Sequence, residues 1–242
     1  MSWNQPSFNQ PTNRESFVPV DARDERVGAF LSRVYGWMFL GLLITAGTAY
    51  FVASSPALVE TLIGNRLVFW GLIIAQLGLV FYLSARVEHV APATASLLFI
   101  VYSGLTGVTS SVILLAYTRA SIAQTFIIAG TMFGTMAVFG TITKRSLAGV
   151  GQFFFMGLIG IVIAMVVNIF LQSNALQFVI SVIGVLVFTG LTAWDAQRLK
   201  QLAVALPEGK AGSFAIVGAL SLYLDFINLF FFLLHLTGGR RD

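Results

Sequence analysis

Seven long apolar runs dominate this chain of 242 residues. A helix that crosses a hydrocarbon core about 30 Å thick needs roughly 20 residues, because each residue adds about 1.5 Å. Five of the runs contain no Asp, Glu, Lys or Arg, and the other two contain one aspartate each. Most of the chain is therefore predicted to lie in lipid, with spans over residues 34–53, 67–85, 93–116, 120–141, 147–171, 176–196 and 213–236.

The composition and the pattern of the runs predict helices. Hydrophobic residues make up 57% of the chain and charged residues only 10%, with a mean hydropathy of +0.87. The runs are continuously apolar, whereas the strands of a membrane barrel alternate in polarity. We expect an all-α integral membrane protein with a seven-helix domain over residues 34–242, preceded by a mobile cytoplasmic tail over residues 1–33.

The distribution of basic residues predicts an orientation. A cytoplasmic N-terminus places ten basic residues on the cytoplasmic side and four on the other side, as the positive-inside rule favours. Arg240 and Arg241 are the exception, because a seventh full span puts them outside. The short loops and the absence of cysteine favour a bacterial inner membrane. The scattered basic residues do not resemble a nucleic-acid-binding surface, and two histidines are too few for a histidine metal site.

Small and hydroxyl residues indicate helix packing inside the bundle. Gly130 and Gly134 form a GxxxG pattern in the fourth run, which would let a neighbouring helix approach closely. The third run carries six hydroxyl residues, and we expect them to bond back to their own helix or across helices. They are Ser96, Ser103, Thr106, Thr109, Ser110 and Ser111.

Asp225 lies about 12 residues from either end of the last run, which places it roughly 18 Å from each membrane surface. An ionised aspartate at that depth costs about 2.5 to 3.5 kcal/mol on insertion scales, so such a residue normally faces a protein interior or an aqueous cavity. Ser221, Asn228 and His235 follow the helical spacing of Asp225 and form a polar face with it.

Asp195 has two alternative interpretations. Thr189, Thr192 and Asp195 recur every three residues in the sixth run. Asp195 is either an interfacial carboxylate paired with Arg198, worth a few tenths of a kcal/mol, or a partner of Asp225 across adjacent antiparallel helices. Two carboxyl groups in a low dielectric cannot both ionise cheaply, so such a pair would hold one proton between them.

Several long motifs resemble the Bax inhibitor-1 family, also called the transmembrane Bax inhibitor motif family. The resemblance covers the chain from about Tyr35 to its end. It rests on GLVFYLSARV from Gly78, ASIAQTFIIAGTMFGTMAVFGTITKRSL from Ala120, LVFTGLTAWDAQRLK from Leu186 and ALSLYLDFINLFFFLLHLTGGRR from Ala219.

The resemblance implies a bundle arranged around a central seventh helix, a pH-dependent calcium leak, and an aspartate pair as the pH sensor. Asp195 and Asp225 are the matching positions. Arg86 corresponds to an arginine that some members have near the pore, whereas Gln76 stands where those members have a glutamate. Ser146 replaces the aspartate of a Thr-Lys-Arg-Asp motif that is frequent in the family.

The leading hypothesis is a passive, pH-gated calcium leak without a cofactor, in which the aspartate pair is both the sensor and a weak, transient calcium site. Oxygen ligands from Thr192 or Asn228 would complete that site, and Arg86, Arg198 and Ser221 are candidates for supporting the gate. The alternatives are a non-conducting regulator that binds a membrane protease or a cell-death-type protein, and a proton-coupled exchanger. Catalytic motifs such as HExxH and GxSxG are missing, so an enzyme is not expected. A shared proton can clamp two helices shut or hold them open, and the sequence leaves that direction open.

Overall fold

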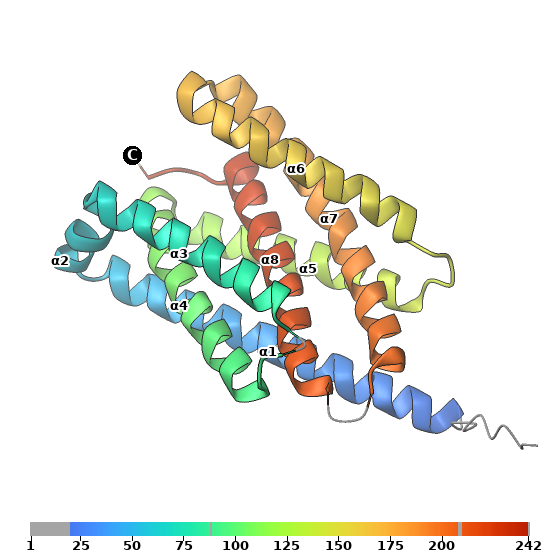
Figure 1. Cartoon of the computed structure of the whole chain (residues 1–242). Coiled ribbons are helices and arrows are strands. Elements are labelled where there is room, and N and C mark those ends of the chain that lie inside the picture. Colours follow the sequence, from blue (N-terminus) through green and yellow to red (C-terminus); the bar gives the residue numbers. More distant parts are fainter. Residues whose placement is uncertain (1–19, 88, 208–209, 242) are drawn as a thin grey trace, which may run out of the picture.

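The computed structural model describes residues 20–87, 89–207 and 210–241, and within these ranges every long element is a helix (Figure 1). The predicted all-α class is therefore confirmed, and seven of the described helices are long and apolar enough to span a membrane. The elements are α1 (Val20–Ala53), α2 (Pro56–Val59), the π-helical turn η1 (Glu60–Gly64), α3 (Arg66–Ala85), α4 (Pro92–Ala116), α5 (Arg119–Ile142), α6 (Ala148–Leu171), α7 (Asn174–Ala205) and α8 (Ala211–Thr237).

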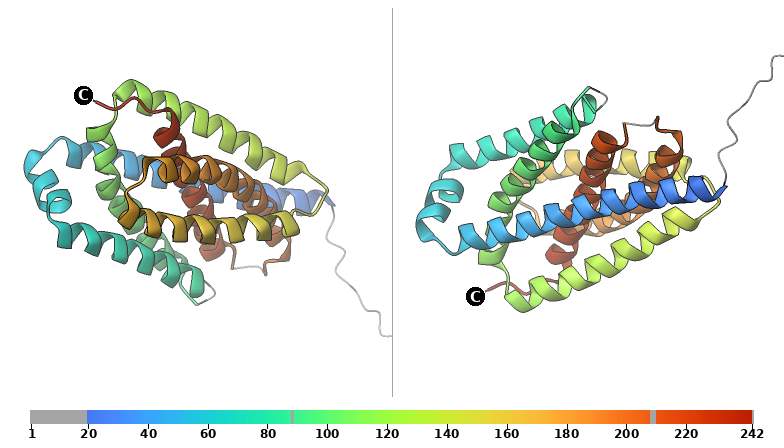
Figure 2. Two further views of the ribbon diagram at one scale, coloured as in Figure 1. Left: turned by 90° about the horizontal axis from the view of Figure 1, so that it is seen from above. Right: turned by 90° about the horizontal axis from the view of Figure 1, so that it is seen from below.

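The long helices alternate in direction, so the connections fall on two faces. The N-terminal face carries the start of α1 and the connections α3–α4, α5–α6 and α7–α8, and the C-terminal face carries the other connections and the end of α8 (Figures 1 and 2). Three helices that start on the C-terminal face have a capping side chain. Asn65, Thr118 and Ser173 accept hydrogen bonds from backbone N–H groups in the first turns of α3, α5 and α7.

Two helices are longer than the spans predicted for them. α1 begins at Val20, so residues 20–33 of the predicted tail are helical, while residues 1–19 lie outside the described part of the chain. α7 continues past Arg198 and Lys200 to Ala205. Hydropathy marks where a helix leaves the membrane, whereas the helix itself ends only where its backbone hydrogen bonds end. With 34 residues, α1 is about 51 Å long and exceeds the bilayer thickness.

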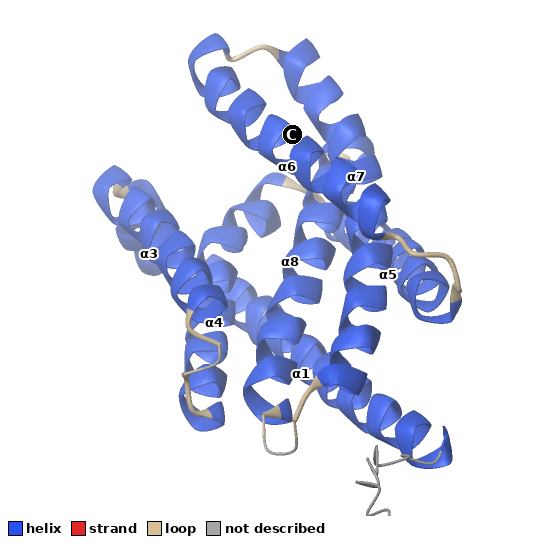
Figure 3. Ribbon diagram, turned by 45° about the vertical axis from the view of Figure 1, so that its right-hand side comes forward, coloured by secondary structure: helices blue, strands red, loops and turns tan. Residues whose placement is uncertain are grey.

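The last helix is the most enclosed of the seven candidate spans. About 72% of its apolar window is buried, and α8 contacts α1, α3, α4, α5 and α7. Figure 3 shows α8 running between α4 on one side and α7 on the other. By contrast, only 6% of the corresponding windows of α3 and α6 is buried, so these helices present apolar side chains to lipid.

Close helix contacts occur at glycines outside the GxxxG pattern. A Cβ atom at Gly140 of α5 would collide with the backbone of Ala193 in α7, and one at Gly107 of α4 would lie 2.6 Å from the carbonyl oxygen of Thr45 in α1. Gly130 and Gly134 have no atom within 4 Å of the position that a Cβ would take, so the close helix contact predicted there is wrong within this chain. Glycine spacing alone does not say on which side of a helix its neighbour lies.

The hydroxyl groups of α4 are used for packing, as predicted. Ser103 and Thr106 are buried and donate hydrogen bonds to the carbonyl oxygens one turn earlier, at 2.8 and 3.0 Å. Ser96 and Thr109 also bond one turn back, and Ser111 bonds to Val108. These bonds satisfy five of the six hydroxyls inside their own helix, so the helix can be buried on one face. The prediction is wrong for Ser110, whose buried Oγ has no hydrogen-bond partner among the described residues.

The chain end is fastened to the α4–α5 connection. The backbone N–H of Thr118 donates to the carbonyl oxygen of Gly239 at 3.1 Å, and the N–H of Arg241 donates to that of Ala116 at 3.0 Å. The Arg241 guanidinium donates to the carbonyl oxygen of Leu114 at 3.2 Å. A cation near the last carbonyl groups of α4 is favourable, because these groups carry the negative end of the helix dipole. Residues 238–241 therefore form a strap, which ties the end of α8 to the α4–α5 connection on the C-terminal face.

We predict that Gly140→Ala destabilises the fold. The added methyl group meets helix backbone, which cannot move aside cheaply, and overpacking of this kind costs about 1–3 kcal/mol. Thermal unfolding in detergent should show a lower midpoint for this variant. Gly134→Ala, on the same helix but in open space, is the matched control and should unfold at or above the temperature of the unmodified protein. Equal midpoints for the two variants would contradict the close α5–α7 contact.

Candidate functional site

Asp225 lies near the middle of α8 and is only 5% exposed. Its neighbours along α8, including Leu222, Tyr223 and Phe226, are also buried. One carboxyl oxygen, Oδ2, is fully buried and has no hydrogen-bond partner among the described residues. A buried polar atom without a partner is uncommon in folded proteins and carries a free-energy cost, so it calls for a functional explanation.

Asp195 lies on α7 and lines a cavity of about 200 Å³. The cavity is bounded by the end of α3, the last part of α7 and the first half of α8, near the N-terminal face. Ser84, Arg198 and Ser221 contribute its other polar side chains. By liquid volume, in which one water occupies about 30 Å³, such a cavity has room for several waters or a partly hydrated ion.

Asp195 and Asp225 lie close enough to interact electrostatically, but no hydrogen bond joins their carboxyl groups. The charge of Asp195 acts on the carboxyl group of Asp225. Ser221, which lines the cavity with Asp195, lies one helical turn before Asp225 on α8. The cavity therefore reaches from the N-terminal face to within one turn of the buried carboxyl group. Direct sharing of a proton stays a prediction.

Arg198 does not form a direct ion pair with Asp195. Its guanidinium lies 5.6 Å from the centre of the Trp194 ring, in a cation–π arrangement. The charge of Arg198 nevertheless acts on Asp195, because both side chains line the same cavity. The direct ion pair considered for Asp195 is therefore not formed, and Arg198 acts on Asp195 only through its charge.

The other predicted site residues have more local roles. Thr192 is fully buried and donates to the carbonyl oxygen of Phe188 at 2.7 Å. Asn228 donates to that of Leu224 at 2.8 Å. Arg86 is exposed at the end of α3, next to residues that line the cavity but outside the lining itself. These observations do not test a role in gating, so the gating roles of Thr192, Asn228 and Arg86 stay predictions.

Gln197 is a well-anchored residue that the sequence interpretation missed. Its side chain accepts a hydrogen bond from the N–H of Leu147 and donates one to the carbonyl oxygen of Arg145, both at 2.8 Å. Lys200, almost one turn later, donates to the carbonyl oxygen of Thr141 at 2.8 Å. The turn of α7 that carries Asp195 is therefore fastened to the α5–α6 connection. The available signal was a glutamine directly after the apolar Ala196 and two residues before the apolar Leu199.

Tyr223, two residues before Asp225, packs α8 against α1 and α4. It is fully buried, and its hydroxyl lies 2.6 Å from Oγ1 of Thr45 on α1. Thr45 also donates to the carbonyl oxygen of Ser103 on α4 at 3.0 Å. The Tyr223 ring meets Phe99 and Tyr102 edge to face. These contacts fix the rotation of α8, and with it the direction in which Asp225 points.

Gln76 belongs to a polar contact between α3 and α4. Thr106 donates to its Oε1, and its Nε2 donates to the hydroxyl of Thr109, both at 3.4 Å. No group of three or more His, Asp or Glu side chains gathers anywhere in the described ranges. Within those ranges a tight carboxylate cage for calcium is therefore not built, and any cation site at the aspartate pair would have few protein ligands.

The fold and the buried carboxyl groups define a multi-pass α-helical membrane protein with an acidic site inside the bundle. Residues 27–242 match the family described as "Inhibitor of apoptosis-promoting Bax1". The chain belongs to this family, which confirms the resemblance to Bax inhibitor-1 proteins.

Bacterial relatives match nearly the whole chain. It is 48% identical to "Inner membrane protein YbhL" of Escherichia coli strain K12, over 88% of this chain and 92% of that protein. It is 43% identical to a protein of Deinococcus radiodurans, over 90% of this chain and 93% of the relative. The family match over residues 27–242 includes all seven apolar runs of the sequence.

We predict that Gln197→Met frees the α5–α6 connection. The change removes two hydrogen bonds of about 1 kcal/mol each, so local opening should become roughly 10- to 30-fold more frequent. Limited digestion with trypsin should then cut faster after Lys144 or Arg145, with the cut sites mapped by mass spectrometry. Gln201→Met, an exposed position one turn later, is the control and should leave the rate unchanged. Unchanged cleavage in Gln197→Met would show that the connection does not depend on this contact.

Proposed function

We propose that this protein is a pH-sensitive calcium leak in which Asp195 and Asp225 form the sensor. The observation that carries the proposal is the buried, unpartnered carboxyl oxygen of Asp225, one helical turn from a cavity whose lining includes a second carboxyl group, that of Asp195. Protons and calcium ions compete for the same oxygen atoms at such a pair. Occupancy of the site by calcium should therefore depend on pH.

The depth of Asp225 supports a permeation role over a storage role. An ionised carboxylate in the middle of a span is costly, and a passing cation or a proton lowers that cost. Two carboxylates with a few neutral oxygens bind calcium weakly, which suits an ion that must also leave. Among the described residues there is no compact acidic loop of the kind that binds calcium tightly.

The proposed location is a bacterial inner membrane, as the name of the Escherichia coli relative suggests, with the N-terminal face in the cytoplasm. Nine of the described basic residues lie on or near that face, and four lie on or near the C-terminal face. Arg241, one of the four, donates a hydrogen bond to the carbonyl oxygen of Leu114, which supports a structural role for this basic residue on the C-terminal face. The nine are Arg23, Arg26, Arg33, Arg86, Lys144, Arg145, Arg198, Lys200 and Lys210.

In this proposal the protein lets ions pass through the membrane without catalysing a reaction. Calcium is the permeant ion, protons are the regulator, and the lipid bilayer is the main partner. Neither an enzymatic activity nor a resident cofactor is part of the mechanism, and no nucleic acid is involved. An exchanger is distinguished from a leak by uphill calcium movement when a pH gradient is imposed.

We predict that Asp225→Asn abolishes the pH dependence of calcium flux. Asn has nearly the same shape but no titratable proton, so the flux should no longer respond to pH through the aspartate pair. Liposomes that contain the protein and a calcium dye provide the measurement. Asp24→Asn, at an exposed position on α1, is the matched control and should keep the full response. A normal pH response in Asp225→Asn would exclude the proposed sensor.

A non-conducting regulator is the second candidate, and the outward-facing GxxxG pattern favours it. Gly130 and Gly134 have open space beside them, and a cavity of about 430 Å³ adjoins Gly134 between α1 and α5. A helix of a membrane protease or of a cell-death-type protein could pack there, because small residues allow close approach.

Measurements of calcium flux and of partner binding distinguish the regulator from the calcium leak. If the protein is a regulator, Gly130→Leu with Gly134→Leu should abolish copurification of a membrane partner, because the added side chains fill the space that the partner helix would take. Calcium flux in liposomes should then be at background level for both the unmodified protein and the variant. Strong flux that the double variant retains would instead favour the leak. Gly149→Leu, at another glycine with open space, controls for the added apolar bulk.

A further inference from the structure

A cavity in the C-terminal half of the bundle, which we call the C-terminal cavity, is separate from the aspartate cavity and is not part of the proposed leak. Its volume is about 290 Å³, and it lies between α1, α4, α5 and α8. Its lining includes Tyr50, three residues before the end of α1, and Phe226, eleven residues before the end of α8. The cavity therefore lies roughly 5–17 Å below these helix ends, at the depth of hydrocarbon. We propose that it binds the ring of a quinone dissolved in the membrane.

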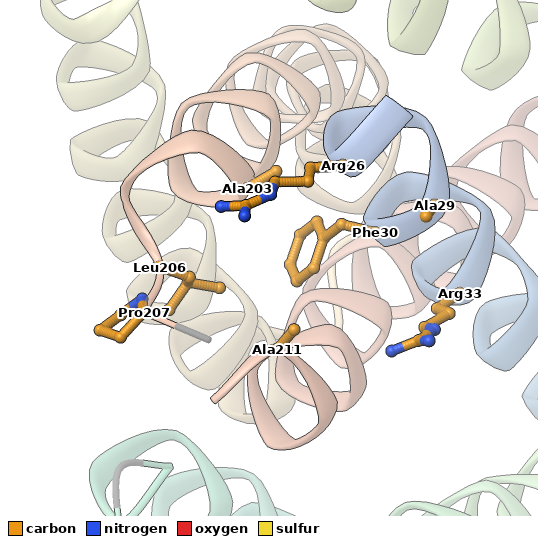
Figure 4. A pocket seen from close by; sticks show the side chains of 8 residues that line it. All are labelled: Arg26, Ala29, Phe30, Arg33, Ala203, Leu206, Pro207 and Ala211. Carbon is orange, nitrogen blue, oxygen red and sulfur yellow. The ribbon is translucent and has the colours of Figure 1, made fainter. Parts of the chain in front are cut away.

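The lining of the C-terminal cavity contains no charged side chain among the described residues. The cavity at the N-terminal end of α1 is different, because its lining includes Arg26 and Arg33 beside Phe30 (Figure 4). Tyr50 on α1 and Phe126 on α5 are both exposed and line the C-terminal cavity, so it opens towards lipid between these two helices. A ligand that enters apolar walls from lipid must itself be uncharged and soluble in the membrane.

The volume of the C-terminal cavity fits a molecule of two fused rings. In another protein, an apolar cavity of about 150 Å³ holds one molecule of benzene. The C-terminal cavity, at about 290 Å³, is about twice as large. A naphthoquinone has this size, since it consists of two fused six-membered rings with two carbonyl groups. The isoprenoid tail of a membrane quinone would extend through the opening between α1 and α5 into lipid.

The walls of the C-terminal cavity favour a flat ring over a lipid chain. The rings of Phe126 and Phe226 meet edge to face with their centroids 5.3 Å apart, and those of Phe126 and Phe230 do so at 6.2 Å. All three side chains line the cavity, so a further ring can join this cluster in an edge-to-face or offset arrangement. An acyl chain gains little from such walls, because the lipid that it leaves is equally apolar.

Ser110 on α4 offers a hydrogen bond to a carbonyl group of the ligand. It lines the C-terminal cavity, and its buried Oγ has no hydrogen-bond partner among the described residues. The hydroxyl of Thr45, which also lines the cavity, is already bonded to Tyr223 and to two backbone carbonyl oxygens. A hydroxyl without an acceptor in hydrocarbon carries a free-energy cost, and rotation about its Cα–Cβ bond would turn it to a carbonyl oxygen in the cavity. The ligand therefore combines a flat apolar ring with a hydrogen-bond acceptor, as a quinone does.

Titration calorimetry of the full chain in dodecylmaltoside tests the proposal, with menadione, a naphthoquinone without a long tail, as the probe. We expect saturable binding of one menadione per chain after the titration into empty micelles is subtracted. The chain has no cysteine, so menadione cannot form a thiol adduct with it. Detergent chains are present in large excess, so saturable binding shows that the cavity prefers the ring. Uptake no greater than that of empty micelles would overturn the proposal, because it would indicate a groove filled by alkyl chains.

A change at Ser110 tests the hydrogen bond. Ser110→Ala should weaken menadione binding about fivefold, which corresponds to the loss of one hydrogen bond. Methylnaphthalene, which has the two rings without the carbonyl groups, should bind equally well to this variant and to the unmodified protein. Ser96→Ala, at an exposed serine of α4 that bonds to its own helix, is the matched control and should leave menadione binding unchanged. Equal menadione affinities of Ser110→Ala and the unmodified protein would contradict the proposed contact.

A filling variant locates the site. Ala46→Phe fills the C-terminal cavity from α1 and should weaken menadione binding more than about tenfold. Gly47→Phe places the same side chain at the next position, which has open space and does not line the cavity, and should bind menadione normally. Thermal unfolding without ligand checks that each variant is folded, and Ser110→Ala should unfold at or above the temperature of the unmodified protein, since it removes an unsatisfied hydroxyl. Unchanged binding in Ala46→Phe would place the quinone elsewhere and overturn the proposal. Since the measurement is quinone binding, its outcome is independent of calcium flux.

Discussion

The enclosure of α8 by other helices is the constraint on which the rest of the structure depends. An aspartate halfway along a membrane span is tolerated only where protein or water replaces lipid around it. α8 meets this condition through contacts with five other helices, whereas α3 and α6 face lipid along most of their length. Close backbone contacts at Gly107 and Gly140 tighten the surrounding helices, and the bond between Tyr223 and Thr45 fixes the rotation of α8. The orientation of Asp225 is thus a property of the whole bundle.

The last part of α7 links the buried site to the surface of the molecule. Asp195 and Arg198 line the cavity beside α8, while Gln197 and Lys200 bond to the α5–α6 connection. These four residues lie within two turns of one helix, so a shift of that helix moves the cavity wall and the connection together. The wall of the cavity and the α5–α6 connection are thus joined by direct hydrogen bonds from one turn of α7.

The two faces of the molecule are stabilised by different means. On the C-terminal face, the strap formed by residues 238–241 bonds to the α4–α5 connection, and Arg241 lies at the negative end of the α4 dipole. On the N-terminal face, α1 and α7 extend beyond the apolar spans and leave a basic pocket between their ends. The C-terminal face is thus held mainly by backbone bonds of the chain end, while side chains such as Gln197 and Lys200 fasten the helix ends on the N-terminal face.

The sequence by itself determined the class, the number of candidate spans, the family and the position of Asp225 in the middle of the last span. These features depend on hydrophobicity and on the cost of a buried charge, and both can be read residue by residue. Only the tertiary structure decided the extent of α1 and α7, the outward direction of Gly130 and Gly134, and the role of Gln197, because these depend on helix rotation, tilt and neighbours. The same reason explains why spacing predicted a polar face around Asp225 but could not give its distance from Asp195. Each helix carries its own periodicity, but the register between two helices is set by the side chains that interlock across their contact.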